Sequence, residues 1–185
     1  EDIISFHHQN GDLQSPSLPF VEPNDLNEIA TETDFLGINY YSRAVIRSSE
    51  IPEEDNDQRT VFTAPESEST DMGWEVYPKG IQNLLEQVYE TYAPPAIYIT
   101  ENGCAYGTGP NEDGTIEDTR RLAYFHGHLN ACLDAINTGV PLKGYFAWSL
   151  LDNFEWAYGY TKRFGLVWVD YETLERTPKE SAFWY

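Results

Sequence analysis

The 185-residue chain has few basic residues and only two cysteines, and it contains no long apolar run. Without about 20 consecutive apolar residues it offers no candidate membrane-spanning helix, and it shows no leader of the signal-peptide kind. Eleven basic residues stand against 31 acidic ones, and the resulting net charge of −20 disfavours binding to nucleic acid or anionic lipid. We therefore expect neither nucleic acid nor membrane as a partner, and the scarcity of cysteine favours a cytoplasmic location.

The few cysteines and histidines predict no metal site. Cys104 and Cys132 match neither a metal-binding spacing nor a dense disulfide framework. Cys132 falls on the apolar stripe of a predicted helix, where a thiol is usually a small buried apolar group. None of the histidines is paired with cysteines or carboxylates at metal-ligand spacing. They are His7, His8, His126 and His128.

Three apolar runs with helical patterns between them predict an α/β fold. The runs are DFLGINYYS from Asp34, AIYIT from Ala96 and GYFAWSLL from Gly144, and each has the character of a parallel strand covered on both faces. Apolar residues recur at helical spacing over 81–92 and 118–137. This alternation predicts a parallel sheet or barrel. Three such units cannot close a barrel, and alone they leave two bare edges, so we expect a larger fold.

The remaining segments carry weaker signals. Residues 50–75 contain nine acids and one arginine without lasting periodicity, which predicts a long solvated loop. VEPND at 21–25 lies in a proline-rich stretch with no strand before it, and we interpret it as a linker. A helix is expected to begin within KESAFWY at the end of the sequence. Phe146 and Trp168 are expected in the core.

Polar and aromatic side chains follow each predicted strand. The first run ends in Asn39-Tyr40-Tyr41, the second continues into Glu101-Asn102-Gly103, and the third is followed by LDNFEWAYGYTKRFG. In a β/α barrel the carboxyl ends of the strands meet at one face, which holds the active site. Aromatic faces with scattered carboxylates and amides suit a carbohydrate, because sugar C–H faces stack on rings while each hydroxyl needs a polar partner.

Each of these features also has a simpler interpretation. Glu-Asn-Gly after a strand is by itself more often a turn, and an aromatic run is more often core than a sugar platform. Glu155, between Phe154 and Trp156, could be a surface residue. The joint occurrence of these residues at successive strand ends favours Glu101 as a carboxylate aimed at an anomeric carbon. A tyrosine hydroxyl bonded to it would favour the charged form.

The sequence resembles the carboxyl-terminal half of glycoside hydrolase family 1, the β-glucosidase family. The resemblance rests on DFLGINYYS, GWEVYPKGI, YITENG, DTRRLAYFHGHL and, most specifically, GYFAWSLLDNFEWAYGYTKRFGLVWVDYETLERTPKES. It implies that residues 1–185 form the carboxyl-terminal portion, about the last three β/α units, of one (β/α)8 TIM barrel. It also implies a retaining hydrolase that takes a β-glucoside or cello-oligosaccharide and needs no cofactor.

The resemblance assigns a role to seven residues. Glu101 matches the nucleophile and Tyr41 the tyrosine that hydrogen-bonds it. The others match positions of the sugar subsite, where a carboxylate at position 155 is typical of the branch acting on non-phosphorylated sugars. A 6-phospho-β-glycosidase is the less favoured alternative, because a small residue replaces this acid in the branch acting on 6-phosphorylated sugars. Lys162 does not discriminate, since the family carries a lysine there in both branches. The expected substrate-binding residues are Asn39, Trp148, Glu155, Trp156 and Phe164.

One part of the family pattern is missing from the sequence. The general acid/base sits in a Thr-x-Asn-Glu-Pro motif of the amino-terminal half, and no such motif occurs here. We therefore expect the amino-terminal half of the same enzyme, as a separate or further piece, to be a partner that supplies this group. A carbohydrate-binding or pseudoenzyme module without turnover, and a half-barrel that folds alone, are the competing hypotheses. Preference between glucoside and galactoside stays open.

Overall fold

The computed structural model describes residues 11, 20, 22, 24–45 and 67–185, and the chain divides into two units, Glu1–Thr33 and Asp34–Tyr185. The first unit contains the short helix α2, Asp25–Ile29, which no pattern in the sequence predicted. Asn24 precedes this helix, and its carbonyl accepts the backbone N–H groups of Asn27 and Glu28 at 3.0 and 3.1 Å. Asp25, the last residue of the stretch interpreted as a linker, is the first residue of this helix.

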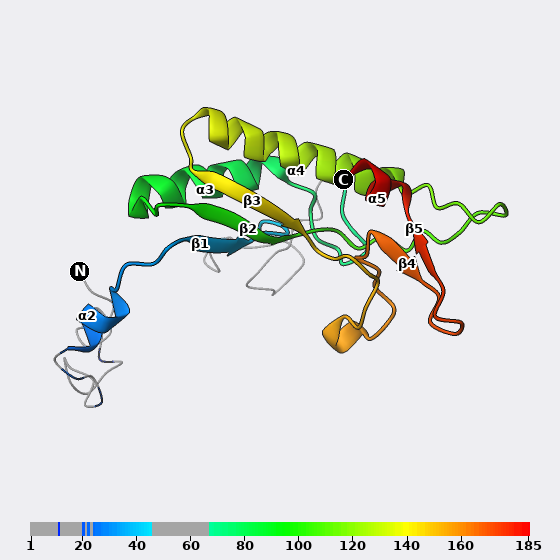
Figure 1. The fold of residues 1–185 in the computed structure, drawn as a ribbon, viewed down its shortest axis with the longest axis horizontal. Coiled ribbons are helices and arrows are strands. Elements are labelled where there is room, and N and C mark those ends of the chain that lie inside the picture. Colours follow the sequence, from blue (N-terminus) through cyan, green and yellow to red (C-terminus); the bar gives the residue numbers. More distant parts are fainter. Residues whose placement is uncertain (1–10, 12–19, 21, 23, 46–66) are drawn as a thin grey trace, which may run out of the picture. The chain divides into compact units, whose positions relative to one another are not determined.

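The second unit is built on a parallel three-stranded sheet. Its strands are β1 (Leu36–Asn39), β2 (Ile97–Asn102) and β3 (Leu142–Ala147), in the order β1-β2-β3 (Figure 1). Two adjacent parallel strands that follow one another in sequence must be joined by a crossover connection. In this sheet each crossover connection contains a helix. The predicted strand–helix alternation is therefore confirmed. The third strand begins two residues earlier and ends four residues earlier than the apolar run predicted.

Two amphipathic helices cover one face of the sheet (Figure 1). They are α3, Pro78–Tyr92, and α4, Thr119–Asn137. Proline is tolerated in the first turn of a helix because the N–H it lacks has no partner there. Helix α3 ends at Ala93, whose φ of 44° is left-handed, and two prolines follow. Helix α4 is followed by Gly139, whose left-handed φ of 103° prevents the helix from continuing.

The core lies between the sheet and these helices. Ile97 and Ile99 of β2 are fully buried against Ile81 of α3 and Cys132 of α4, and the prediction of a buried Cys132 is confirmed. Side chains on the sheet face away from the helices are more exposed to solvent. The strands are therefore not buried on both faces. The prediction that Phe146 is a core residue was wrong, because its side chain points away from the helices and is 58% exposed.

Buried charged groups hold the carboxyl-terminal part of the chain in place. The Asp152 carboxylate accepts hydrogen bonds from Lys179 Nζ at 3.0 Å and Arg163 Nη1 at 2.7 Å, and Lys179 is fully buried. Burial lowers the pKa of Lys179 to about 8. The predicted terminal helix is confirmed. The elements of this part are η1 (Trp156–Tyr158), β4 (Val167–Val169) antiparallel to β5 (Arg176–Pro178), and α5 (Glu180–Trp184).

The predicted acidic loop is only partly among the described residues, since 46–66 lie outside them. Its last part folds back on itself through a bridge between Ser69 and Glu75. The Arg120 guanidinium on α4 holds this segment by donating to the Glu68 carboxylate at 2.7 Å and to the Ser69 carbonyl at 2.9 Å. The segment 67–76 is thereby fixed beside the carboxyl end of β2.

Candidate active site

Glu101 lies near the carboxyl end of β2, half-buried, with its backbone paired to the end of β1. The backbone N–H of Tyr40 donates to the Glu101 carbonyl at 2.9 Å. The next residue, Tyr41, donates from its hydroxyl to Glu101 Oε2 at 2.7 Å. The strand pairing therefore brings together the two side chains for which the resemblance implied this hydrogen bond.

Tyr41 is held in place by aromatic packing. Its ring centroid lies 5.4 Å from that of Trp74 and 6.1 Å from that of Phe164, the latter in an edge-to-face arrangement. Burial, and then the hydrogen bond to Glu101, raise the pKa of the Tyr41 hydroxyl above its ordinary value. The phenol therefore stays protonated and remains a donor to the carboxylate at any pH of physiological interest.

Gly103 lets the ends of β2 and β3 approach closely. A Cβ atom at this position would lie 1.8 Å from the carbonyl oxygen of Trp148, a distance that no real side chain tolerates. The backbone N–H of Trp148 donates to the Asn102 carbonyl at 2.8 Å. The glycine is therefore needed to seat the tryptophan beside Glu101, and Glu-Asn-Gly is more than a turn.

A cavity of about 540 Å³ opens at these strand ends. It is lined by six of the seven predicted site residues, which the structure brings to one place. The seventh, Asn39, is not among the lining residues, and its Oδ1 accepts a hydrogen bond from Thr100 Oγ1 at 2.6 Å. The lining residues are Tyr41, Met72, Trp74, Glu101, Trp148, Asn153, Phe154, Glu155, Trp156, Ala157, Tyr158 and Phe164.

Glu155 presents a second carboxylate to the same cavity. It precedes the turn η1, which is closed by a hydrogen bond from the Glu155 N–H to the Gly159 carbonyl at 2.7 Å. Burial, and then the negative charge of Glu101, raise the pKa of the Glu155 carboxyl. Trp156 has a φ of 42°, a left-handed conformation that is unfavourable for a bulky side chain, and its indole is 81% exposed. Such conformations concentrate at functional sites.

Six lining residues were not among the predicted site residues: Met72, Trp74, Asn153, Phe154, Ala157 and Tyr158. Trp74 belongs to GWEVYPKGI, a stretch quoted for the resemblance, so this motif was the signal that could have led to it. Met72 carries no local signal. It reaches the cavity because Lys162 Nζ donates to the Asp71 carbonyl at 2.6 Å and Gly107 N–H donates to Asp71 Oδ2 at 2.7 Å. These contacts join positions far apart in sequence.

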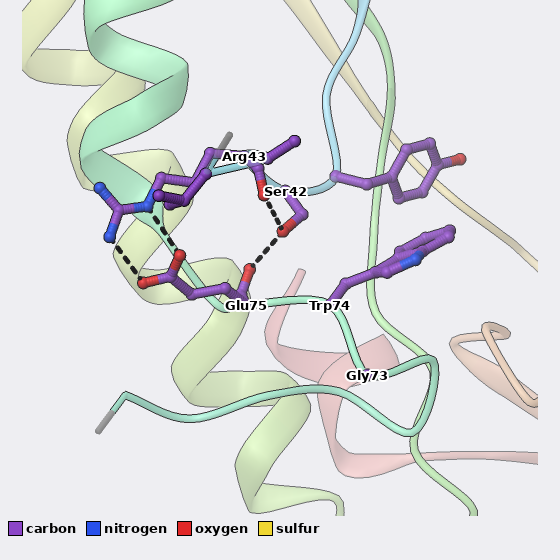
Figure 2. A pocket seen from close by; sticks show the side chains of 8 residues that line it. Ser42, Arg43, Gly73, Trp74 and Glu75 are labelled. Atoms are coloured by element: carbon purple, nitrogen blue, oxygen red, sulfur yellow. Dashed lines mark hydrogen bonds and ion pairs between the residues drawn. The ribbon is translucent and has the colours of Figure 1, made fainter. Parts of the chain in front are cut away.

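A smaller cavity of about 350 Å³ lies on the other side of the Tyr41–Trp74 wall. Figure 2 shows Arg43 and Glu75 pointing toward one another there, while Trp74 points away from both. Arg43 Nε and Nη2 donate to the two Glu75 carboxylate oxygens at 2.7 and 3.0 Å, and Ser42 Oγ donates to the Glu75 carbonyl at 3.0 Å. Arg43 lowers the pKa of the Glu75 carboxyl. This ion pair joins the two backbone segments that contain Tyr41 and Trp74.

The sequence profile described as Glycosyl hydrolase family 1 matches residues 5–185. The chain belongs to this family. β-Glucosidase A of Thermotoga maritima is 46% identical over 168 residues, which cover 91% of this chain and 37% of that protein. The 6-phospho-β-galactosidase of Clostridium acetobutylicum is 39% identical over 176 residues, covering 86% and 37%.

Solved family 1 structures share the fold. The β-glucosidase of Thermotoga maritima in complex with castanospermine matches with a TM-score of 0.83 at 42% identity, covering all of this chain and 39% of that one. The chain thus spans little more than a third of the length of these relatives. The predicted fold class is confirmed: the chain has the fold of the carboxyl-terminal portion of a family 1 α/β barrel.

The described residues contain no group of three or more histidine, cysteine or acidic side chains arranged to hold a metal ion. Within the same part of the chain, no helix has both the length and the apolar character required to cross a bilayer.

Proposed function

We propose that this chain supplies the nucleophile and part of the sugar subsite of a retaining β-glucosidase. The observation that carries the proposal is the hydrogen bond of 2.7 Å from Tyr41 to Glu101 at the wall of an aromatic cavity. A carboxylate oriented by a protonated phenol in a cavity lined by aromatic rings suits attack on an anomeric carbon. Family membership and the β-glucosidases among the relatives support the same activity.

In the proposed reaction Glu101 attacks C1 of the bound glycoside from its α face. The bond between C1 and the leaving oxygen breaks, that oxygen takes a proton from the general acid, and a covalent α-glycosyl ester forms on Glu101. The same acid, now a base, removes a proton from water, whose oxygen attacks C1 and releases the β-sugar. Retaining enzymes place this second carboxyl about 5–5.5 Å from the nucleophile. The resemblance assigns it to the amino-terminal half of the enzyme.

The other predicted residues would bind the non-reducing sugar. The Trp148 indole offers an apolar face for the sugar ring. Glu155 and Trp156 are proposed to bind the hydroxyls at C4 and C6, and Phe164 closes the same subsite. Asn39 remains a proposed sugar ligand. Its Oδ1 accepts from Thr100 Oγ1, so its NH₂ group is the proposed donor to a sugar hydroxyl.

We further propose that residues 1–185 are the carboxyl-terminal part of a single (β/α)8 barrel and that the amino-terminal half of the same enzyme completes it. The open face of the sheet supports this arrangement, since Phe35 and Phe146 are each more than half exposed there. Apolar side chains at such positions normally pack inside a barrel. The exposed face and the unpaired outer edges of β1 and β3 in the described sheet also argue against a half-barrel that folds alone.

A 6-phosphorylated substrate is the second candidate, raised by the 6-phospho-β-galactosidase among the relatives. Two observations favour the non-phosphorylated substrate. The Glu155 carboxylate faces the cavity and would repel a phosphate. Lys162, two residues before Phe164, donates to the Asp71 carbonyl and does not line the cavity.

The test is covalent trapping in the full-length protein that contains this chain. A 2-deoxy-2-fluoro glucoside with a good leaving group should add one sugar to the peptide bearing Glu101, detected by mass spectrometry. The matched variant Glu101→Gln should give no adduct. A folded wild-type protein that binds cellobiose and yet forms no adduct and hydrolyses no glycoside would establish the binding module instead. Efficient hydrolysis of only the 6-phosphoglucoside would establish the phosphorylated substrate.

A further inference from the structure

A buried polar cluster lies behind the candidate nucleophile, on the helix side of the sheet. It consists of Asn102 from β2, Tyr124 from α4 and Tyr145 from β3. Asn102 is fully buried and Tyr124 is 1% exposed. None of the three lines the cavity, so nothing in the proposed chemistry calls for a polar group at these places. A buried polar cluster is costly unless its hydrogen bonds are satisfied.

The hydrogen bonds of Asn102 are satisfied and fix the orientation of its amide. Nδ2 donates to the Tyr40 carbonyl at 2.6 Å and to the Tyr124 hydroxyl at 2.9 Å. Oδ1 accepts from the Tyr145 hydroxyl. A carbonyl oxygen can only accept, so the group facing Tyr40 must be the NH₂ group. The amide therefore ties the carboxyl end of β1 to β2, one residue beyond Glu101.

Tyr124 makes a second connection to the same place. Its hydroxyl, which accepts from Asn102, donates to the backbone carbonyl of Tyr41 at 3.3 Å. Its ring is stacked on that of His128 at a centroid distance of 3.9 Å, which limits rotation of the side chain. Burial raises the pKa of the Tyr124 hydroxyl, so it remains a donor. One hydroxyl from α4 thus contacts the amide beside Glu101 and the carbonyl of the residue that binds Glu101.

We propose that Tyr124 is a positioning residue for the Tyr41–Glu101 pair, acting from the outer side of the sheet through the Asn102 amide and the Tyr41 carbonyl. Removal of its hydroxyl leaves one Asn102 donor and the Tyr41 carbonyl without this partner, although the ring still fills the core. The backbone of Tyr41 can then shift, and the phenol with it. A misplacement of about 1 Å can cost about a hundredfold in rate, because the reacting groups must be held in attack geometry. The inference rests on the proposed function.

The test is a double-mutant cycle in the full-length enzyme with Tyr124→Phe, Tyr41→Phe and the double variant. Tyr124→Phe should lower kcat about tenfold with KM within about twofold of wild type. In the Tyr41→Phe background the same substitution should cost less than about twofold, because the contact through which it acts is gone. The control is Tyr106→Phe, which removes a buried hydroxyl bonded to Glu68 at 2.8 Å and should leave kcat within about twofold.

Two kinetic results would overturn the inference. One is an unchanged kcat for a folded Tyr124→Phe variant. The other is an equal loss in both backgrounds, which would mean that Tyr124 acts independently of Tyr41. A crystal structure of Tyr124→Phe provides a readout apart from activity: the Tyr41 Oη to Glu101 Oε2 distance should lengthen beyond hydrogen-bonding range. If the wild type hydrolyses no glycoside, the proposed function fails, while this distance still decides the positioning role; an unaltered distance refutes it.

Discussion

Acidification should destabilise this fold through one residue, His128. The imidazole is fully buried on α4, and its Nδ1 lies 2.8 Å from the Tyr124 carbonyl oxygen. Because that oxygen can only accept, Nδ1 carries the proton of the neutral ring. The other nitrogen, Nε2, has no hydrogen-bond partner among the described residues. A proton added there would create a buried charge without a partner, so burial lowers the pKa of His128 to about 4.

The sign and size of the effect follow from this shift. The folded-state pKa of about 4 is below the unfolded value of about 6.5, so the unfolded chain binds the proton more tightly. The stabilisation is fully present above about pH 6.5 and is lost as the pH falls toward 4. At one pKa unit per about 1.4 kcal/mol, the free energy of unfolding should decrease by about 2 kcal/mol by pH 5 and about 3 kcal/mol in total.

The assay is urea unfolding of the full-length protein at pH 7 and pH 5. The variant His128→Asn retains an N–H donor for the Tyr124 carbonyl and does not titrate, so it should lose about 2 kcal/mol less than wild type between these pH values. The control is His126→Asn, at an exposed position of the same helix, which should retain the wild-type pH dependence. Equal pH dependence of wild type and His128→Asn would refute the reasoning, whatever the absolute stabilities.

Three further substitutions test the packing and charges of the site. Tyr41→Phe should lower kcat by about 10- to 100-fold, since hydrogen bonds to charged groups are worth about 1.5–3 kcal/mol; steady-state kinetics would measure this. Asp152→Asn leaves the buried Lys179 ammonium without its counter-charge and should cost about 3–5 kcal/mol in urea unfolding. Gly103→Ala should cost about 1–3 kcal/mol, because its Cβ would overlap the Trp148 carbonyl.

Each of these has a result that would contradict it. Unchanged kcat in Tyr41→Phe would mean that the phenol is a packing residue only. A stability of Asp152→Asn within about 1 kcal/mol of wild type would mean that Lys179 is neutral or hydrated in the fold. For Gly103→Ala, the control is Gly109→Ala, where an added Cβ meets no atom within 4 Å, and equal stability of the two variants would contradict the close approach.

The architecture could be predicted because its signals are local. Continuous apolar runs and helical periodicity identified all three strands of the sheet and the two helices between them. Ends of elements were less predictable: the third run is apolar to Leu151, yet β3 stops at Ala147, where Trp148 turns to pack its carbonyl against Gly103. Phe146 was assigned to the core because an aromatic run is more often core than a sugar platform, but such a run does not show how much of each sheet face the chain itself covers.

Site residues at the ends of strands could be predicted from the sequence. Site residues that are positioned by long-range contacts could not. Glu101 and Tyr41 follow adjacent strands, and parallel pairing puts them side by side. Met72 and Trp74 belong to a segment positioned by contacts such as that from Lys162 to the Asp71 carbonyl, which spans 91 residues. No local pattern encodes such a contact. Family resemblance could supply Trp74, because its surroundings form a motif, but not Met72.

The directions of Glu101 and Asn102 follow from an irregularity in β2. Ile97 and Ile99 face the helices, and strict alternation would put Glu101 on the same side as them. The register shift between Ile99 and Asn102 instead leaves the Glu101 carboxylate at the cavity and the Asn102 amide on the helix side. At that position an apolar side chain would fill space but leave the carbonyl of Tyr40 unpaired, whereas the Asn102 amide binds it. Gly103 then lets the next strand end close over the site. Glu101 faces the cavity, Asn102 faces the helices, and Gly103 allows the close approach of the Trp148 carbonyl. Exchanging any two of these residues should therefore abolish the site even though the composition is unchanged.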